Sequence, residues 1–306
     1  MGYNFRNLYE LIKIAYREGS GIISRGSIKK ALSVYTPSGM ERYEIMRSLG
    51  LNFKNVLGNE KIKKELSYLK QYLKHPKLFQ KNGIERSNIL VFSGPSGAGK
   101  TYMAKALAGE LGVPMIYIDA VELFGRSGPI MGIKRIASLG RRFKNCIIFV
   151  DEFDKLIGQE MMSDDRELIG SFEAEIDGIR EKTKAIIILT MNNKARFGTA
   201  FHDRIPCFDF SLPSETERKE FISNKIKKSD IPFSQEQIEF FAKTTENKSY
   251  RQIERIWNNI LFRIMEKEGT VIKNNKIIAS DRAIEESIKE IFGFVSEARH
   301  IPSMFG

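Results

Sequence analysis

The sequence predicts an α/β fold: a parallel five-stranded sheet flanked by helices, followed by an all-helical subdomain. Five short apolar runs support the sheet, and helical patterns separate most of them. Nearly continuous apolar strands that alternate with helices are typical of a parallel sheet covered on both faces. The five runs are NILVFS (88–93), PMIYID (114–119), CIIFV (146–150), AIIILT (185–190) and CFDFS (207–211).

The chain of 306 residues divides into three predicted parts. Residues 1–50 read as short helices interrupted by glycine and serine, so we expect a small N-terminal helical segment. Residues 51–212 hold the α/β pattern. From residue 213 to residue 306 the apolar runs stop and helical patterns follow, two of which begin with capping boxes, SETE (214–217) and SQEQ (234–237). We therefore expect a C-terminal helical subdomain over residues 213–306.

Composition limits the function classes. Hydrophobic residues make up 42% of the chain and charged residues 28%, which is ordinary for a soluble globular protein. No apolar run approaches the roughly 20 residues of a membrane helix, and no H-E-x-x-H zinc-protease motif occurs. Cys146 and Cys207 lie in apolar runs, which favours buried thiols in a reducing compartment such as the cytoplasm. The net charge of +11 fits either solvated helix faces or a nucleic-acid surface, and the basic residues are spread along the chain.

A glycine-rich turn between a predicted strand and a predicted helix indicates a phosphate site. Residues 94–101 read GPSGAGKT and match G-x-x-x-x-G-K-[ST]. Glycines allow backbone N–H groups to face phosphate oxygens, and the following helix adds its positive dipole end. Lys100 is expected to reach the β- and γ-phosphates and Thr101 to bind Mg²⁺. The predicted nucleotide-binding residues here are Pro95, Ser96, Gly97, Ala98, Gly99, Lys100, Thr101 and Tyr102.

Polar residues at the ends of two later strands complete the predicted site. Asp151 and Glu152 follow an apolar strand, and the carboxyl ends of parallel strands line the ligand crevice. We expect Asp151 to hold Mg²⁺ and Glu152 to polarise the attacking water, which indicates a hydrolase. Asn192, at the end of the next strand, would bring a neutral amide to that water. A polar turn after each strand is the alternative explanation.

These pieces, in this order, resemble the AAA+ ATPases of the P-loop NTPase class. The similarity is closer to the classic AAA branch and, within it, to the ATPase module of the FtsH-like AAA proteases, which are membrane-tethered. The resemblance runs from about residue 52 to about residue 265, where the helical part corresponds to the lid. The zinc protease domain and the transmembrane segments of that group are not found, so no protease activity is expected of this chain. Beyond the glycine turn, the segments that carry the resemblance are FKNVLGNEKIKKELSYLKQYLKHPKLFQKNG (53–83), CIIFVDEFDKLIG (146–158) and FEAEIDGI (172–179).

The resemblance implies roles for residues outside the glycine turn. Val56, Leu57 and Gly58 would lie beside adenine. Phe124 and Gly125 would fall in a loop that faces a central pore, where an aromatic side chain grips an extended polypeptide. The sequence around Phe124 is one residue out of step with the family pattern, and a buried core phenylalanine is the alternative.

It also implies two arginine roles. Arg204 would reach into the site of a neighbouring subunit, with Arg196 as the other candidate. Arg251, in NKSYRQIERI (247–256), resembles the second-sensor arginine of other AAA+ branches and would contact the γ-phosphate. The alternative for Arg251 is a helix-surface arginine paired with Glu254.

Three functions are compatible with the sequence. The first is Mg²⁺-dependent ATP hydrolysis that drives remodelling or unfolding of a protein substrate by a homo-hexameric ring. The second is an AAA+ ATPase of the clamp-loader or initiator type that acts on nucleic acid, although no winged-helix or helix-turn-helix pattern is found. The third is a regulatory nucleotide-binding module with slow turnover.

Overall fold

The computed structural model defines the backbone of most of the chain. The residues that it describes are 5–35, 43–47, 50–84, 87–121, 129–143, 145–156, 185–192, 205–229, 231–268, 270–273 and 276–298.

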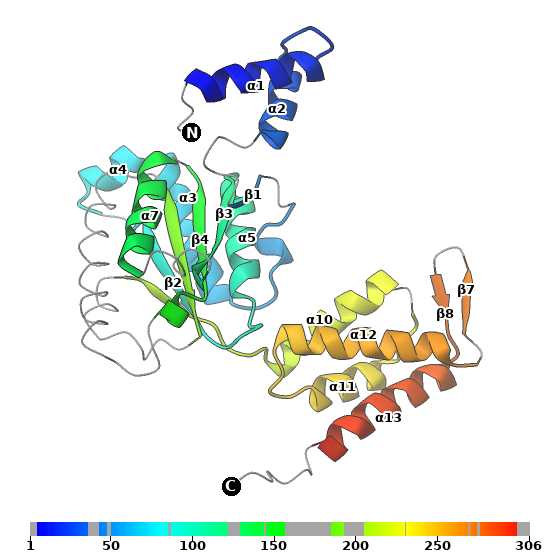
Figure 1. Ribbon diagram of the computed structural model, residues 1–306. Coiled ribbons are helices and arrows are strands. Elements are labelled where there is room, and N and C mark those ends of the chain that lie inside the picture. Colours follow the sequence, from blue (N-terminus) through cyan, green and yellow to red (C-terminus); the bar gives the residue numbers. More distant parts are fainter. Residues whose placement is uncertain are drawn as a thin grey trace. The chain divides into compact units, whose positions relative to one another are not determined.

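A mixed sheet lies at the centre of the α/β part (Figure 1), and its strand order is β1-β3-β4-β5-β2-β6. The pairs β3–β4, β4–β5, β5–β2 and β2–β6 are all parallel. The five predicted parallel strands are therefore confirmed, and their carboxyl ends meet at one edge. The strands are β1 (Glu44–Met46), β2 (Ile89–Ser93), β3 (Met115–Asp119), β4 (Ile147–Asp151), β5 (Ile186–Met191) and β6 (Cys207–Asp209).

One strand of this sheet was not expected from the sequence. β1 lies within the segment predicted to be helical and pairs antiparallel with β3, with Glu44 opposite Tyr117. The sequence around Glu44–Met46 has neither an apolar run nor an alternating pattern, so only the pairing with β3 reveals this strand. β1 adds an antiparallel edge to an otherwise parallel sheet, a common arrangement in large α/β sheets.

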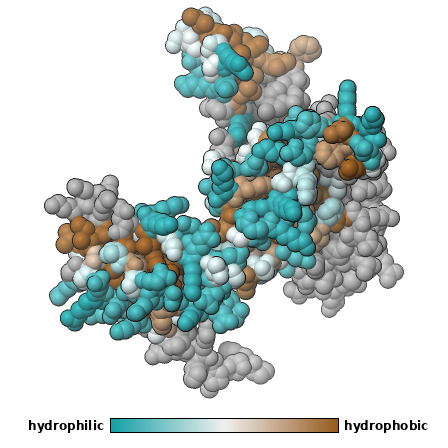
Figure 2. Space-filling model, turned by 180° about the vertical axis from the view of Figure 1, so that it is seen from behind, coloured by the Kyte–Doolittle hydropathy of each residue, from teal (hydrophilic) through white to brown (hydrophobic). Residues whose placement is uncertain are grey.

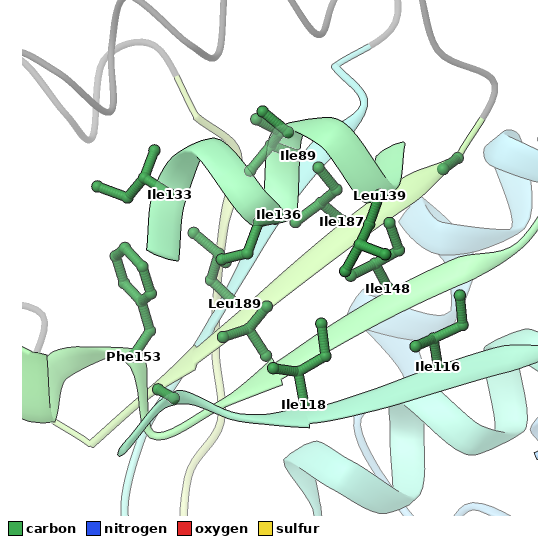
Figure 3. Close-up of a cluster of buried hydrophobic side chains, with 14 of the residues drawn as sticks. Ile89, Ile116, Ile118, Ile133, Ile136, Leu139, Ile148, Phe153, Ile187 and Leu189 are labelled. Atoms are coloured by element: carbon green, nitrogen blue, oxygen red, sulfur yellow. The ribbon is translucent and has the colours of Figure 1, made fainter. Parts of the chain in front are cut away.

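Helix α7 (Pro129–Arg142) covers one face of the sheet. Figure 3 shows its side chains Ile133 and Ile136 over the strand residues Ile148 and Leu189, and all four side chains are buried. Neighbouring positions along each strand point to opposite faces. Branched residues at every second position of β3, β4 and β5 therefore supply this layer of the core.

Helices α5 (Lys100–Leu111) and α3 (Glu60–Lys74) lie on the other face of the sheet (Figure 1). α5 contacts α3, β4 and β5, and its apolar residues in the middle turns are fully buried. The helix also approaches the preceding segment closely, because a Cβ atom at Gly109 would come within 1.7 Å of the Leu51 carbonyl oxygen. η1 (Phe53–Asn55) precedes α3, and α4 (Pro76–Lys81) follows it.

The N-terminus forms a pair of packed helices, α1 (Phe5–Glu18) and α2 (Arg25–Val34). Their small core consists of Leu11, Ala15 and Ala31. α2 begins with a capping box at Ser24, which stabilises a helix that contributes few buried residues. The predicted N-terminal helices are present, and they precede β1.

The C-terminal part is a helical unit with one small hairpin. Trp257 and Phe241 belong to its core, which is separate from that of the sheet. The antiparallel strands β7 (Val271–Lys273) and β8 (Lys276–Ile278) were not expected, and they are also only three residues long. The helices are α10 (Glu215–Ser229), α11 (Gln235–Thr244), α12 (Tyr250–Glu266) and α13 (Asp281–Ala298).

The chain divides into two compact units. The first comprises residues 1–94 and 100–209, and the second comprises residues 95–99 and 210–306. The glycine-rich residues Pro95–Gly99 thus group with the helical unit, although they connect a strand to a helix of the first unit. Within the described residues, no helix is both long enough and apolar enough to cross a membrane.

Candidate nucleotide site

The glycine-rich turn leaves β2 and enters α5, as the sequence predicts. Gly97 and Gly99 have φ angles of 77° and 100°. Residues with a Cβ atom rarely adopt such angles, so glycine is required at both positions to make the turn. Thr101 and Tyr102 then lie in the first turn of α5, and Tyr102 is 42% exposed.

Lys100 and Asn192, which the sequence suggested separately, are in contact. The Lys100 ammonium group donates a hydrogen bond to Asn192 Oδ1 at 3.0 Å and another to the Gly94 carbonyl oxygen. Lys100 is only 8% exposed, so these polar partners compensate the cost of burying its charge. A positive charge and a neutral amide therefore stand together at the carboxyl ends of β2 and β5.

Asp151, the last residue of β4, receives a hydroxyl group on each carboxylate oxygen. Thr190 of β5 donates to Oδ1 at 2.5 Å, and Tyr117 of β3 donates to Oδ2 at 3.0 Å. Burial raises the pKa of Tyr117 well above its ordinary value, and the charge of Asp151 raises it further, so the phenol keeps its proton. The sequence predicted Asp151 but gave no role to Tyr117.

Glu152 directly follows the strand and has an unusual backbone. Its φ angle is 55°, in the left-handed region that residues with a Cβ atom seldom adopt. Its N–H group donates to Thr190 Oγ1 at 2.9 Å and to Asp151 Oδ1 at 3.2 Å. Strain of this kind is often found at functional sites, where surrounding contacts hold it in place. Here the same hydroxyl that binds Asp151 also fixes the Glu152 backbone.

The carboxylate of Glu152 forms an ion pair with Lys155, three residues further along in η2 (Phe153–Leu156). This hydrogen bond is the main reason that the pKa of Lys155 is raised. Both side chains are partly exposed, so solvent screens the pair and it is weak. Glu152 can therefore exchange Lys155 for another partner at little cost.

Asp154 is a site residue that the sequence reasoning missed. Its side chain is 4% exposed, and its Oδ2 atom accepts a hydrogen bond from the Asn192 N–H group at 3.0 Å. Asp154 thus ties the turn after β4 to the end of β5, where Asn192 lies. Its position as the third acid of the segment DEFD (151–154) could have indicated that Asp154 lies near the site.

In the helical unit, Arg251 lies beside the glycine-rich turn. Its guanidinium group donates to Ser96 Oγ at 3.4 Å. Ser249, which caps α12, is so near that a Cβ atom at Gly97 would come within 2.6 Å of its hydroxyl oxygen. Glu254, the alternative partner for Arg251, instead pairs with Lys225.

The other predicted site residues lie before α3 or outside the described part. Val56, Leu57 and Gly58 lie between η1 and α3; Val56 is buried and Gly58 has a φ angle of 62°. The remaining predicted residues, Phe124, Gly125, Arg204 and its alternative Arg196, lie outside the described residues.

The oxygen atoms at the candidate site suit an Mg²⁺ ion that is bound together with a nucleotide. Asp151 and Thr101 offer hard oxygen atoms, which Mg²⁺ prefers, and Mg²⁺ usually takes only one or two protein ligands beside phosphates and water. Within the described ranges, no cluster of three or more histidine, cysteine or acidic side chains could hold a metal ion by protein ligands alone. These residues therefore fit a metal ion whose other ligands include phosphate oxygen atoms.

The fold and this cluster define a P-loop nucleotide-binding protein: a parallel sheet, a glycine-rich turn at a helix start and an Asp-Glu pair on a nearby strand. The model of the ATPase family associated with various cellular activities (AAA) matches residues 90–212. A putative 26S proteasome regulatory subunit homolog from Methanocaldococcus jannaschii is 30% identical over 95% of this chain and 76% of its own length. The chain belongs to the AAA family of ATPases.

Other relatives agree with this assignment. A putative 26S proteasome regulatory subunit homolog from Methanothermobacter marburgensis is 28% identical over 94% of this chain and 74% of its own length. The ATP-dependent zinc metalloprotease FtsH of Mycoplasmopsis synoviae is 30% identical over 76% of this chain. The match covers only 36% of that FtsH, so the chain spans about a third of its length.

Proposed function

We propose that this chain hydrolyses ATP to ADP and phosphate with Mg²⁺, and that hydrolysis in a homo-hexameric ring drives remodelling or unfolding of a protein substrate. The observation that supports this most is the convergence of Lys100, Asn192, Asp151 and Glu152 at the carboxyl ends of adjacent strands. In that order, the four residues supply a cation for phosphate, a neutral amide, an acid of the type that binds a metal, and a base.

Different residues of the chain have different proposed roles in hydrolysis. Lys100 neutralises charge on the β- and γ-phosphates, for which it gives up its contact with Asn192. Glu152 accepts a proton from the attacking water, and the Asn192 amide orients that water. A bound Mg²⁺ would neutralise the charge that develops on the phosphate oxygens. Glu152 must leave Lys155 to act, and the exposure of both groups keeps that step inexpensive.

Arg251 is the proposed sensor of the γ-phosphate. It already contacts Ser96 of the glycine-rich turn, so its guanidinium group needs only a short movement to reach a bound phosphate. A ligand shifts a conformational equilibrium only as far as it binds the two states differently. A contact made with ATP and lost with ADP is the difference that a remodelling cycle requires.

Three residues have proposed roles in the ring. Arg204 would supply a positive charge to the neighbouring site, and Phe124 with Gly125 would contact the substrate in the pore. These roles come from the family resemblance. Arginines supplied across an interface speed phosphoryl transfer by several powers of ten in other systems. Removal of Arg204 should therefore abolish turnover while ATP binding persists.

Two substitutions test the hydrolytic proposal. Glu152→Gln removes the base and should abolish turnover, retain ATP binding and trap an assembled ring on size measurement. Lys100→Ala removes the phosphate contact and should weaken ATP binding itself. Glu236→Gln, in the first turn of α11, is a matched control that should leave both unchanged.

The outcomes separate the proposal from a slow regulatory module. A wild-type chain with almost no turnover, which Glu152→Gln does not lower further, would indicate regulation by nucleotide binding. A wild-type chain that binds no ATP would contradict both. A chain that turns over ATP but stays monomeric with ATP would exclude the ring.

One observation favours the nucleic-acid alternative. Residues 1–83 hold 16 of the 49 lysines and arginines but only 6 of the 38 acids, so they carry +10 of the net charge of +11. Lysine and arginine contacts to phosphates make affinity fall steeply with salt. ATPase stimulation by DNA, together with such a fall in DNA binding, would favour this function, whereas stimulation by unfolded protein alone would favour remodelling.

The N-terminal helix pair is the proposed docking element for the protein substrate or its adaptor. Large apolar side chains on α1 are exposed, among them Phe5 (92%), Tyr9 (59%) and Ile12 (51%). Figure 2 shows hydrophobic surface over this helix pair. Exposed apolar patches bounded by polar residues commonly mark interaction sites. The surrounding charge is mainly positive, which suits an acidic or mixed protein surface.

A further inference from the structure

The register of the sheet places Tyr117 against the acid that would serve the metal. Tyr117 lies opposite Phe149 in the parallel pair β3–β4, and Asp119 lies opposite Asp151. The Tyr117 ring stacks on Phe149, with centroids 5.7 Å apart and an interplanar angle of 25°. Two residues along a strand span about 7 Å, a distance that the length of a tyrosine side chain can cover. Stacking on Phe149 thus directs the phenol towards Asp151, where it bonds at 3.0 Å.

Asp151 is consequently held from both sides. The hydroxyl of Thr190 comes from β5 and that of Tyr117 comes from β3, and each binds a different carboxylate oxygen. A carboxylate rotates easily about its last side-chain bond, because that torsion has a broad energy profile. Two bonds from opposite strands remove this freedom. Oδ1 also accepts a hydrogen bond from the Glu152 N–H group at 3.2 Å, whereas Oδ2 can accept a further bond beside that of Tyr117, so the carboxylate stays available to a metal-bound water.

We propose that Tyr117 is a positioning residue for Asp151: its hydroxyl group holds the carboxylate in the orientation that Mg²⁺ bound with ATP requires. This inference rests on the proposed function. Tyr117 acts through Asp151 and touches neither nucleotide nor metal. Its ring contributes packing and its oxygen contributes orientation, so the two contributions can be separated by removing the oxygen alone.

Loss of the Tyr117 hydroxyl group has two opposed effects on the binding of the metal. Without the donor the Asp151 carboxylate accepts one hydrogen bond fewer, which favours contact with a cation. It is also free to rotate, and Mg²⁺ demands near-ideal octahedral geometry and gives up its water reluctantly. For Mg²⁺ we expect the orientation of the carboxylate to matter more. Removal of the hydroxyl should therefore lower the affinity for Mg²⁺ rather than raise it.

The test is Tyr117→Phe, which keeps the stacked ring. A fluorescent ATP analogue would be titrated at fixed concentration with Mg²⁺, and its affinity measured again in EDTA. The Mg²⁺ concentration for half-maximal binding should rise about 3- to 10-fold, a part of what a hydrogen bond to a charged group can contribute. Affinity in EDTA should stay within about twofold, since phosphate contacts do not involve Tyr117.

Three further variants make the result interpretable. Tyr68→Phe changes an exposed tyrosine on α3 and should leave the titration unchanged. Thr190→Val removes the other hydroxyl from the same carboxylate and should shift the Mg²⁺ requirement in the same direction, so it tests the inference even if Tyr117→Phe folds poorly. Asp151→Asn should abolish the Mg²⁺ dependence.

The outcomes distinguish this inference from the proposed function. If the wild-type chain shows no Mg²⁺-dependent binding of the analogue, the proposed function fails. If the wild type depends on Mg²⁺ but Tyr117→Phe has the same or a lower Mg²⁺ requirement, only the positioning role fails. An equal loss of affinity with Mg²⁺ and in EDTA would likewise overturn it, because that pattern indicates a general structural effect.

Discussion

Glu152 combines a strained backbone with a side chain that is only weakly paired. Its backbone adopts a left-handed φ of 55° and is fixed by Thr190, while its carboxylate pairs with Lys155. A backbone in this region costs of order 1–3 kcal/mol. The contacts of Thr190 with both acids offset that cost, so Thr190 sets the geometry of the two acids to which the chemistry is proposed.

Asp154 should act in a comparable way on Asn192. We expect Asp154→Asn to lower turnover about tenfold and stability by about 1–3 kcal/mol, because the Asn192 N–H group loses a charged acceptor in a buried position. Phosphate release and thermal unfolding would measure the two effects. Unchanged turnover in a variant with the expected loss of stability would show that Asp154 has no role in positioning Asn192.

Several residues of the site were predictable because their signal is local. Lys100 and Thr101 belong to a continuous motif, and Asp151 and Glu152 follow a recognisable strand. Tyr117 was not predictable, because its role depends on the register between β3 and β4 and on stacking against Phe149. Contacts set by strand pairing leave no pattern in a single sequence.

At the scale of elements, too, local sequence patterns predicted the five parallel strands, whereas the short strands that depend on pairing were missed. Five strands were found from apolar runs of five or six residues. Both faces of the central strands β2, β4 and β5 are buried, whereas β6 lies at the sheet edge and only its Phe208 is buried. The strands β1, β7 and β8 have only three residues each and are visible only through their partners. Helical capping boxes gave the starts of α10 and α11, and their hydrogen bonds are present.

The contact between the glycine-rich turn and the start of α12 leads to a prediction. Gly97→Ala would drive a methyl group into Ser249 and would also strain a φ of 77°. We expect ATP affinity to fall at least about tenfold, because turn and helix must move apart and the cradle of N–H groups is disturbed. Equilibrium binding of ATP measures this directly.

The control for this substitution is Gly293→Ala on α13. A Cβ atom there meets nothing within 4 Å, and alanine favours a helix over glycine by up to about 1 kcal/mol. It should therefore raise the melting temperature slightly and leave ATP binding intact. Normal ATP affinity in Gly97→Ala would mean that the turn does not cradle phosphates as proposed.

At the scale of the whole molecule, the assignment of the glycine-rich turn to the helical unit has a mechanical consequence. Gly94 and Lys100 group with the sheet unit, whereas Pro95–Gly99 group with the helices. The chain itself thus joins the two units through the proposed phosphate loop. Under the proposed function, this loop would hold the phosphates of the nucleotide.

The most direct measurement is a crystal structure of the Glu152→Gln variant with ATP and Mg²⁺. The proposal predicts that backbone N–H groups of Pro95–Gly99 and the Lys100 ammonium group contact the triphosphate. It also predicts that Asp151 lies within reach of the metal and that Lys100 has left Asn192. A nucleotide bound elsewhere, or an Asp151 carboxylate turned away from the phosphates, would contradict the account at its centre.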